Sequence, residues 1–169
     1  VLSKPISRVS YLLGKYLGCV TVLLAVHVIM SFSLTLIILG LGLGLPTGLF
    51  TCFYLMFLES TLILAVALFS SIFSSSVLSS CFTIAIFLIG RSEYAFRSLA
   101  MRPENASRKF LFRALYDILP NLDRFNVREI TAYSKAIPPE MAFTSTVYCL
   151  CYALAFLTIS SVVFMRKDM

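Results

Sequence analysis

The sequence predicts an all-α fold, a polytopic membrane helix bundle with about four transmembrane spans. Of its 169 residues, 59% are hydrophobic and only 13% are charged, whereas about 25% of the residues of a soluble domain are charged. The mean hydropathy is +0.93. The apolar residues gather in long runs without charge, a pattern typical of helices surrounded by lipid. This composition excludes an ordinary soluble globular domain.

Two apolar runs in the first half of the chain are long enough to cross a membrane, for which about 20 residues are needed. The first extends from Tyr16 to Leu39 and contains a single histidine, His27. A turn is predicted after it, since several residues that end helices follow: Gly40, Gly42, Gly44 and Pro46. The second run, residues 49–69, contains one acid, Glu59.

The third run is the shortest and the fourth is long. Serine-rich residues 70–80 predict a turn or close helix packing. The third run is strongly apolar only from Val77 to Gly90, so that a full span requires extension back to Ile72, and a re-entrant segment is the alternative. The fourth run extends from Met141 to Met165, and a charged tail, residues 166–169, follows it.

Residues 91–140 differ in character, because they hold nine of the 14 Lys and Arg residues and six of the eight acids. We expect this region to be solvated. Apolar residues between 110 and 119 recur at helical spacing, which predicts a short amphipathic helix along the membrane surface, ended by Pro120. Asn126 is suited to cap a second short helix. The chain thus divides into residues 1–15, three spans in 16–90, the region 91–140, a last span in 141–165, and the tail.

Charge counting leaves the orientation of the bundle open. The basic residues near both ends favour a cytoplasmic location for the termini: Lys4, Arg8, Lys15, Arg166 and Lys167. The nine basic residues of region 91–140 favour the opposite orientation. That region is long and of mixed charge, however, and the positive-inside rule is weaker for such segments.

Motifs of enzyme chemistry are absent from the sequence. It has no GxxxxGK[ST] phosphate-binding loop and no HExxH, GxSxG or repeated CxxC motif. A single histidine does not supply paired bases or metal ligands. The five cysteines lie inside apolar runs and are interpreted as packing residues: Cys19, Cys52, Cys81, Cys149 and Cys151. We therefore expect no enzyme activity, no cofactor, no metal site and no nucleic-acid partner.

Two polar residues inside the predicted spans require an explanation. A charged acid at the centre of a membrane helix costs roughly 2.5 to 3.5 kcal/mol on insertion scales. Glu59 should therefore face a cavity or a partner group, or be protonated; a structural alternative is an interhelical hydrogen bond to a span serine or to His27. His27 itself is interpreted as a packed, neutral residue of the bundle, with a proton relay as the alternative.

The most specific signal is the opening octapeptide VLSKPISR, followed by YLLGKYLG at residues 11–18. It closely resembles the cytoplasmic coupling segment of bacterial ABC transporter permeases of the type-2 exporter class. The resemblance continues at FLESTLILAVALFSS (57–71), FLIGR (87–91), LPNLDRFN (119–126) and VFMRKDM (163–169). Permeases of this class carry about two further spans before the octapeptide, so the resemblance implies that the chain lacks an N-terminal part.

The resemblance implies the permease subunit of an ATP-driven exporter in the bacterial inner (cytoplasmic) membrane. Its partners are membrane lipid, a separate ABC ATPase subunit and a second permease subunit, in a homodimer or a heterodimer. The coupling segment and the C-terminus are then cytoplasmic, and residues 91–140 are external. An apolar side, a proline and exposed bases suit such a segment for contact with the ATPase, and its expected coupling residues are Leu2, Ser3, Lys4, Pro5, Ile6, Arg8 and Lys15.

Three alternatives remain at this level. The basic residues near the start are also those of a juxtamembrane flank that only sets topology. An ion-coupled secondary transporter would use Glu59 and His27 as its ion path, and a membrane scaffold would recruit a soluble protein through its basic flank. A permease requires an ATPase partner, whereas neither alternative function does. The sequence indicates no substrate.

Overall fold

The computed structural model describes residues 8–92, 120–127, 131 and 138–166. This part of the chain is all-helical and contains no strand, which confirms the predicted fold class. A 3-10 helix, η1, accompanies four α-helices; in chain order the elements are α1 (Arg8–Gly40), α2 (Leu49–Phe73), α3 (Ser76–Arg91), η1 (Leu122–Phe125) and α7 (Pro139–Arg166).

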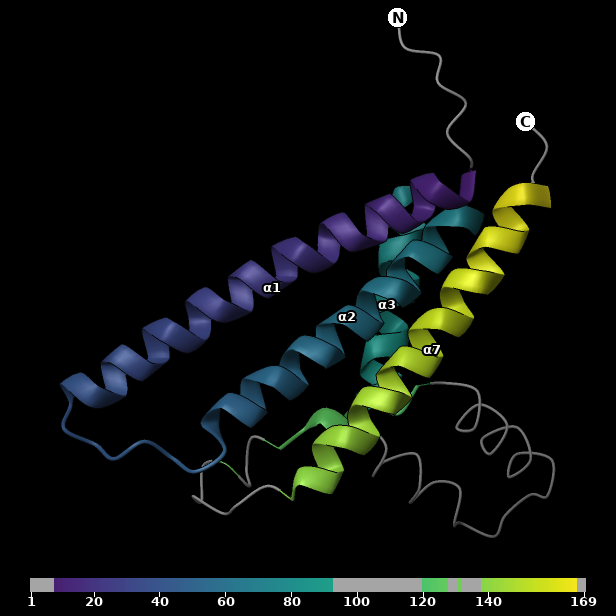
Figure 1. Ribbon diagram of the computed structural model, residues 1–169. Coiled ribbons are helices and arrows are strands. Elements are labelled where there is room, and N and C mark those ends of the chain that lie inside the picture. The colour runs from purple at the N-terminus through teal and green to yellow at the C-terminus, as the bar shows by residue number, and fades with distance from the viewer. Residues whose placement is uncertain (1–7, 93–119, 128–130, 132–137, 167–169) are drawn as a thin grey trace, which may run out of the picture.

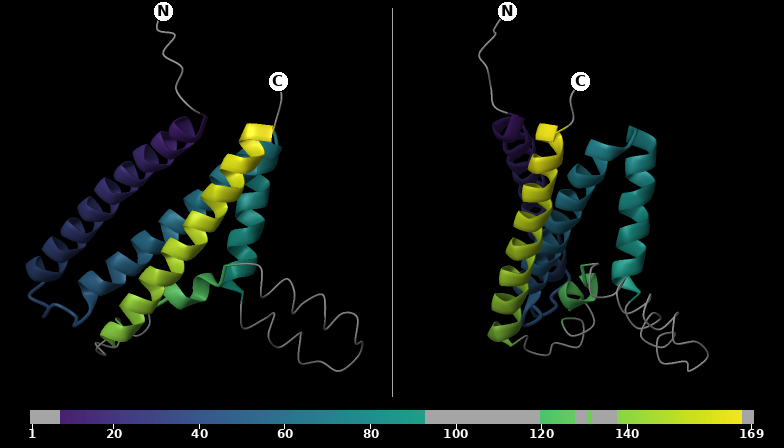
Figure 2. Two further views of the ribbon diagram at one scale, coloured as in Figure 1. Left: turned by 45° about the vertical axis from the view of Figure 1, so that its right-hand side comes forward. Right: turned by 90° about the vertical axis from the view of Figure 1, so that its right-hand side faces the viewer.

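The helices are arranged up and down. The start of α1, the α2–α3 turn and the end of α7 lie at one end of the bundle, and the α1–α2 loop and the start of α7 lie at the other (Figure 1). Figure 2 shows the same arrangement from two further sides, with η1 beside the lower end of α3. Both termini of the described helices therefore lie at one end, as an even number of predicted spans requires.

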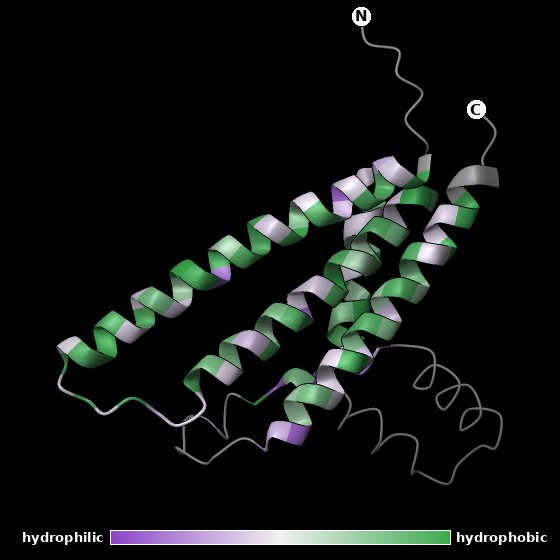
Figure 3. Ribbon diagram, in the orientation of Figure 1, coloured by the Kyte–Doolittle hydropathy of each residue, from purple (hydrophilic) through white to green (hydrophobic). Residues whose placement is uncertain are grey.

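Three of the helices are long and apolar enough to cross a membrane: Val9–Gly40, Leu49–Phe73 and Pro139–Val163. Hydrophobic residues predominate along these helices in Figure 3. The 16 residues of α3 correspond to about 24 Å, less than the hydrocarbon thickness of about 30 Å. The third run does not extend back to Ile72, because α2 includes Ile72 and Phe73 and the turn takes Ser74 and Ser75.

Glycines set the turn between α1 and α2. Gly42 and Gly48 have φ angles of 67° and 97°, a left-handed conformation in which a side chain is unfavourable. Gly42 follows the last turn of α1, and its N–H donates to the carbonyl of Leu39 at 3.0 Å. Gly48 immediately precedes the first residue of α2. The predicted glycine-rich turn is thus confirmed, and it reverses the chain so that α2 runs antiparallel to α1.

Helix α2 is the centre of the bundle, since it contacts α1, α3, η1 and α7. Its Leu55, Leu62 and Ala65 are completely buried. Its most extensive packing is with α7, where the Cys149 thiol donates a hydrogen bond to the carbonyl of Leu58 at 3.4 Å. The core consequently follows the length of α2 instead of forming a compact globule.

Helix α1 is the least covered element. Buried side chains on it are confined to its start, at Leu12 and Tyr16, where the Tyr16 hydroxyl donates to the carbonyl of Thr61 at 3.4 Å. Farther along, large apolar side chains such as Ile29 and Phe32 are each 64% exposed. Such a surface requires lipid or further apolar helices around it.

The segment around η1 corrects the expectation of a solvated region. Leu122, Phe125 and Val127 are almost completely buried, and they belong to the same hydrophobic cluster as Leu55 and Leu62 of α2. Because residues 91–140 are rich in charge on average, their composition did not predict that a few apolar residues among them join the core. The predicted amphipathic helix at 110–119 lies outside the described residues. The second short helix predicted after Asn126 lies for the most part outside the described residues, so its capping is not tested. The Asn121 side chain caps η1 by accepting from the N–H of Asp123.

Candidate functional site

The polar centre of the bundle is an ion pair between α2 and α3. Glu59 Oε1 lies 3.4 Å from Nη1 of Arg91. The Glu59 side chain is 5% exposed and that of Arg91 26%, so the acid is inside the protein and the base is at its edge. The guanidinium also lies 5.7 Å from the ring centroid of Phe87, one turn earlier on α3. Glu59 therefore faces a partner group, and that group is a base.

The hairpin of α2 and α3 explains why these two residues meet. Glu59 lies 15 residues before Ser74, and Arg91 lies 16 residues after Ser75. In antiparallel helices joined by a tight turn, residues equally far from the turn lie at the same level, here about 24 Å from it. Ser79 permits close approach near the turn, because its buried hydroxyl donates to the carbonyl of Ala67 on α2 at 3.4 Å.

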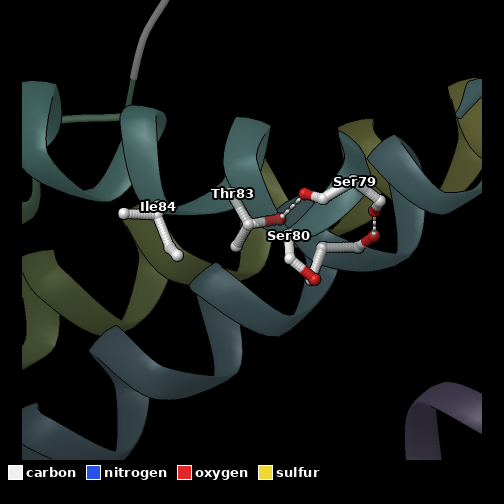
Figure 4. A pocket seen from close by; sticks show the side chains of 5 residues that line it. Ser79, Ser80, Thr83 and Ile84 are labelled. Atoms are coloured by element: carbon white, nitrogen blue, oxygen red, sulfur yellow. Dashed lines mark hydrogen bonds between the residues drawn. The ribbon is translucent and has the colours of Figure 1, made fainter. Parts of the chain in front are cut away.

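Behind Ser79 the two helices leave a shallow hollow lined by hydroxyl residues, shown in Figure 4. The Ser80 hydroxyl donates to the carbonyl of Ser76 at 3.0 Å, and the Thr83 hydroxyl donates to that of Ser79 at 2.8 Å. With Ser79 bonded to α2, each of these hydroxyls is already used. The serine-rich stretch thus supplies both the turn and the close packing that the sequence predicts.

The end of α3 is fixed by a close contact with the segment before η1. A Cβ atom on Gly90 would lie 2.7 Å from the carbonyl oxygen of Pro120 and 3.0 Å from Cγ of Leu122. Only glycine fits at this point without a backbone shift. Since Arg91 is the next residue, the contact at Gly90 also fixes the position of the guanidinium relative to Glu59.

His27 contacts α2 on a different side. Its Nδ1 lies 2.8 Å from the carbonyl oxygen of Leu23, and its Nε2 lies 3.5 Å from Oγ of Ser60. The ring meets that of Phe57 edge to face, with centroids 5.8 Å apart. Ser60, the span serine next to Glu59, is therefore a partner of His27, which is half-buried between α1 and α2.

These contacts place polar groups of three helices around one level of α2. Glu59 and Ser60 are consecutive, and successive side chains of a helix point about 100° apart, which is why one reaches α3 and the other α1. An acid paired with a base in a low-dielectric interior holds its helices together strongly only while both partners are present. Among the described residues no cluster of three or more potential metal ligands exists. The contacts of Glu59 and of Ser60 each join α2 to a neighbouring helix, which suits them to helix positioning.

Most of the predicted coupling residues lie outside the described part: Leu2, Ser3, Lys4, Pro5 and Ile6. Arg8 is the first residue of α1, and Lys15 is exposed on the same helix. The boundary predicted at residue 15 falls within α1, because the helix begins eight residues earlier than the apolar run and continues without a break through Tyr16 to Gly40. Residues 8–15 and the first span are thus one helix.

Sequence reasoning missed three features of this site. Arg91 was assigned to the solvated region, whereas it ends α3 and pairs with Glu59. Once the turn at Ser74 and Ser75 is known, the equal distances of Glu59 and Arg91 from it along the sequence predict that these two residues meet. No sequence signal predicts the close approach at Gly90. The third feature is the stacking of Arg124, an exposed base as predicted, whose guanidinium lies 5.1 Å from the ring centroid of Tyr148.

No protein-family model, curated protein or solved structure matches this chain.

Proposed function

We propose that this chain is the membrane-spanning permease subunit of an ATP-driven ABC exporter in a bacterial inner membrane. It pairs with a second permease subunit and receives energy from a separate ATPase subunit. The resemblance of VLSKPISR and the later segments to type-2 exporter permeases supports this assignment. So does the lack of a phosphate-binding loop in the sequence, because a chain without a nucleotide site must receive energy through a contact.

The observation that carries the proposal is the continuity of α1. The helix extends from Arg8, at the edge of the proposed coupling segment, to Gly40 at the other end of the bundle. A helix of 33 residues is about 50 Å long and transmits a displacement of one end along its axis. Movement of residues 1–8 by an ATPase would therefore reach the His27–Ser60 contact in the middle of the bundle.

The two polar contacts of α2 give such movement a two-state character. Packed helix interfaces have a few discrete arrangements, and an ion pair or a hydrogen bond is made in one arrangement and broken in another. Differential contacts of this kind are what allow a ligand to shift an equilibrium between conformations. Glu59 and Arg91 are proposed to stabilise one of the two states of the permease, and His27 and Ser60 fix α1 to α2.

The ion-coupled carrier is less well supported. It requires Glu59 and His27 to form one path, but Glu59 faces α3 and is neutralised by Arg91, while His27 faces Ser60 and Phe57. The scaffold alternative explains exposed bases such as Lys15 but not an ion pair inside the bundle.

Purification of the tagged chain from its native membranes tests the proposal. We expect a protein with a GxxxxGK[ST] loop to copurify in a fixed ratio, and the complex to hydrolyse ATP. A parallel preparation with residues 1–7 replaced by a Gly/Ser linker is the control, and it should lose the ATPase while keeping the chain in the membrane. Equal hydrolysis and equal partner recovery in both preparations would contradict the role of the segment. Absence of any ATPase from the wild-type preparation would favour a carrier or a scaffold.

A further inference from the structure

A second, open pocket lies at the end of the bundle opposite the start of α1, between η1 and the first turns of α7. Its volume is about 340 Å³, at the lower end of the range for small-ligand sites. The lining residues are Arg124 from η1 and Met141, Thr144 and Ser145 from α7. The pocket therefore combines a positive charge, two hydroxyls and one apolar wall.

Arg124 is held in place by a short chain of contacts. The N–H of Asn121 donates to the Tyr148 hydroxyl at 2.7 Å, which fastens the start of η1 to α7. The Arg124 guanidinium lies over the ring of the same tyrosine. Stacking uses the flat face of the guanidinium and leaves the N–H donors at its edge available. In the described part of the chain no carboxylate pairs with Arg124.

Ser145 supplies an independent observation. Its residue is only 3% exposed, yet within the described chain its hydroxyl makes no hydrogen bond, unlike its neighbours Thr144 and Thr146, which donate to carbonyls one turn earlier. Ser145 lines the open pocket, so a ligand or a water molecule there can form the hydrogen bond that this hydroxyl lacks. In the serine-lined hollow between α2 and α3, by contrast, each hydroxyl already donates to a carbonyl.

In the described part of the chain, the acids nearest in sequence to the lining residues do not line the pocket. The carboxylate of Asp123 accepts a hydrogen bond from the Asn126 side chain at 3.3 Å. Glu140 is exposed and is not among the lining residues. A site with an arginine fork, an unused hydroxyl and no carboxylate among its described lining residues is suited to an oxyanion.

We propose that Arg124 and Ser145 bind a phosphate group, with the guanidinium as the main ligand and the Ser145 hydroxyl as a second donor. The pocket lies beside the start of a helix long enough to span a membrane, the level at which lipid head groups are found. A lipid head group and a free phosphate have this chemistry in common. The proposal does not depend on an ATPase partner.

The experiment uses the purified full chain in detergent and measures its thermal unfolding midpoint during two titrations. One adds inorganic phosphate, with sodium chloride of equal ionic strength as its reference. The other adds phosphatidic acid to the micelles, with phosphatidylcholine as its reference. We expect at least one probe to raise the midpoint with saturation. A response to phosphatidic acid alone identifies a lipid head group as the ligand, and a response to both identifies a site that free phosphate also reaches.

Variants make the test specific. Arg124→Gln should raise the half-saturating concentration at least tenfold, because it removes the charge and the fork. Ser145→Ala removes one donor, and a loss of about fivefold is expected. Arg124→Lys keeps the charge and should fall between wild type and Arg124→Gln. Ser80→Ala, at an exposed and already bonded serine, is the matched control and should bind like wild type.

Two results would overturn the proposal. One is the absence of a saturable response to either probe in the wild-type chain. The other is an equal response in wild type, Arg124→Lys and Ser145→Ala, which would indicate a non-specific effect of anions on the detergent-solubilised protein. If Arg124→Gln does not fold, because its contact with Tyr148 is lost, Arg124→Lys and Ser145→Ala still decide the question.

Discussion

Glu59 Oε1 in the middle of α2 lies 3.4 Å from Arg91 Nη1 at the last residue of α3. This pair joins two helices that are otherwise held by apolar contacts and by the hydrogen bond from Ser79 to the carbonyl of Ala67. Its acid is buried and its base is partly exposed, so the two residues respond differently to the loss of their partner. An unpaired Arg91 is able to reach water, whereas an unpaired Glu59 is left inside the protein.

A double-mutant cycle tests the energetic coupling of the pair. We expect Arg91→Gln to lower the free energy of unfolding more than Glu59→Gln, by about 1 to 3 kcal/mol, because it leaves a buried acid without its base. The double variant should be more stable than the sum of the single effects predicts. Glu140→Gln, at an exposed acid of α7, is the control and should have almost no effect. Additive effects of the two single variants would show that the pair does not stabilise the hairpin.

A methyl group at Gly90 tests the close contact between the end of α3 and the segment before η1. Gly90→Ala should destabilise the protein by about 1 to 3 kcal/mol, because the new Cβ would lie within 2.7 Å of the Pro120 carbonyl. Gly14→Ala is the matched control: it is also a helical glycine, and no atom lies within 4 Å of the added Cβ. It should be neutral or stabilising by up to about 1 kcal/mol. Thermal unfolding in detergent compares them, and equal midpoints would refute the close contact.

The hydroxyl of Tyr148 is expected to anchor η1. Tyr148→Phe leaves the Asn121 N–H without this acceptor and should cost about 1 to 3 kcal/mol. Tyr54→Phe is the control. It removes an exposed hydroxyl that lies 2.9 Å from Oγ1 of Thr146 on α7, and it should cost less than about 0.5 kcal/mol. The same unfolding measurement distinguishes them. A larger effect at Tyr54 than at Tyr148 would count against the anchoring role.

Topology follows from the up-and-down arrangement and the proposed orientation. In a background without the five native cysteines, a cysteine at Ser75 or at position 168 should be cytoplasmic, and one at Leu43 or Asn105 should be external. Labelling of intact cells with an impermeant thiol reagent, before and after permeabilisation, measures this. Reaction at positions 75 and 168 but not at 43 and 105 in intact cells would reverse the orientation.

The fold was largely predictable from the sequence, because long uncharged runs and glycine-rich turns act locally. Three of the four runs correspond to span-capable helices, although the first helix begins seven residues before its run. What the sequence did not predict depends on tertiary contact. Arg91 and Leu122 belong to a region that is charged on average, and average composition does not reveal which of its residues enter the bundle. The pairing of Glu59 required the exact position of a turn inside a run of serines, most of which are compatible with either helix or turn.

The most direct test of the proposed function changes Arg8, the residue at which the proposed coupling segment joins α1. In the complete permease, complexes carrying wild type, Arg8→Lys or Arg8→Glu are compared for recovery of the ATPase subunit and for ATP hydrolysis after reconstitution. We predict normal membrane insertion for all three and near-normal ATPase recovery and hydrolysis for Arg8→Lys. For Arg8→Glu we predict either at least a fivefold loss of bound ATPase or hydrolysis that no longer responds to the permease, because the reversed charge is repulsive at the proposed contact. If Arg8→Glu retains its ATPase and hydrolyses ATP like wild type, Arg8 does not carry coupling, and a basic flank that only sets topology becomes the better account.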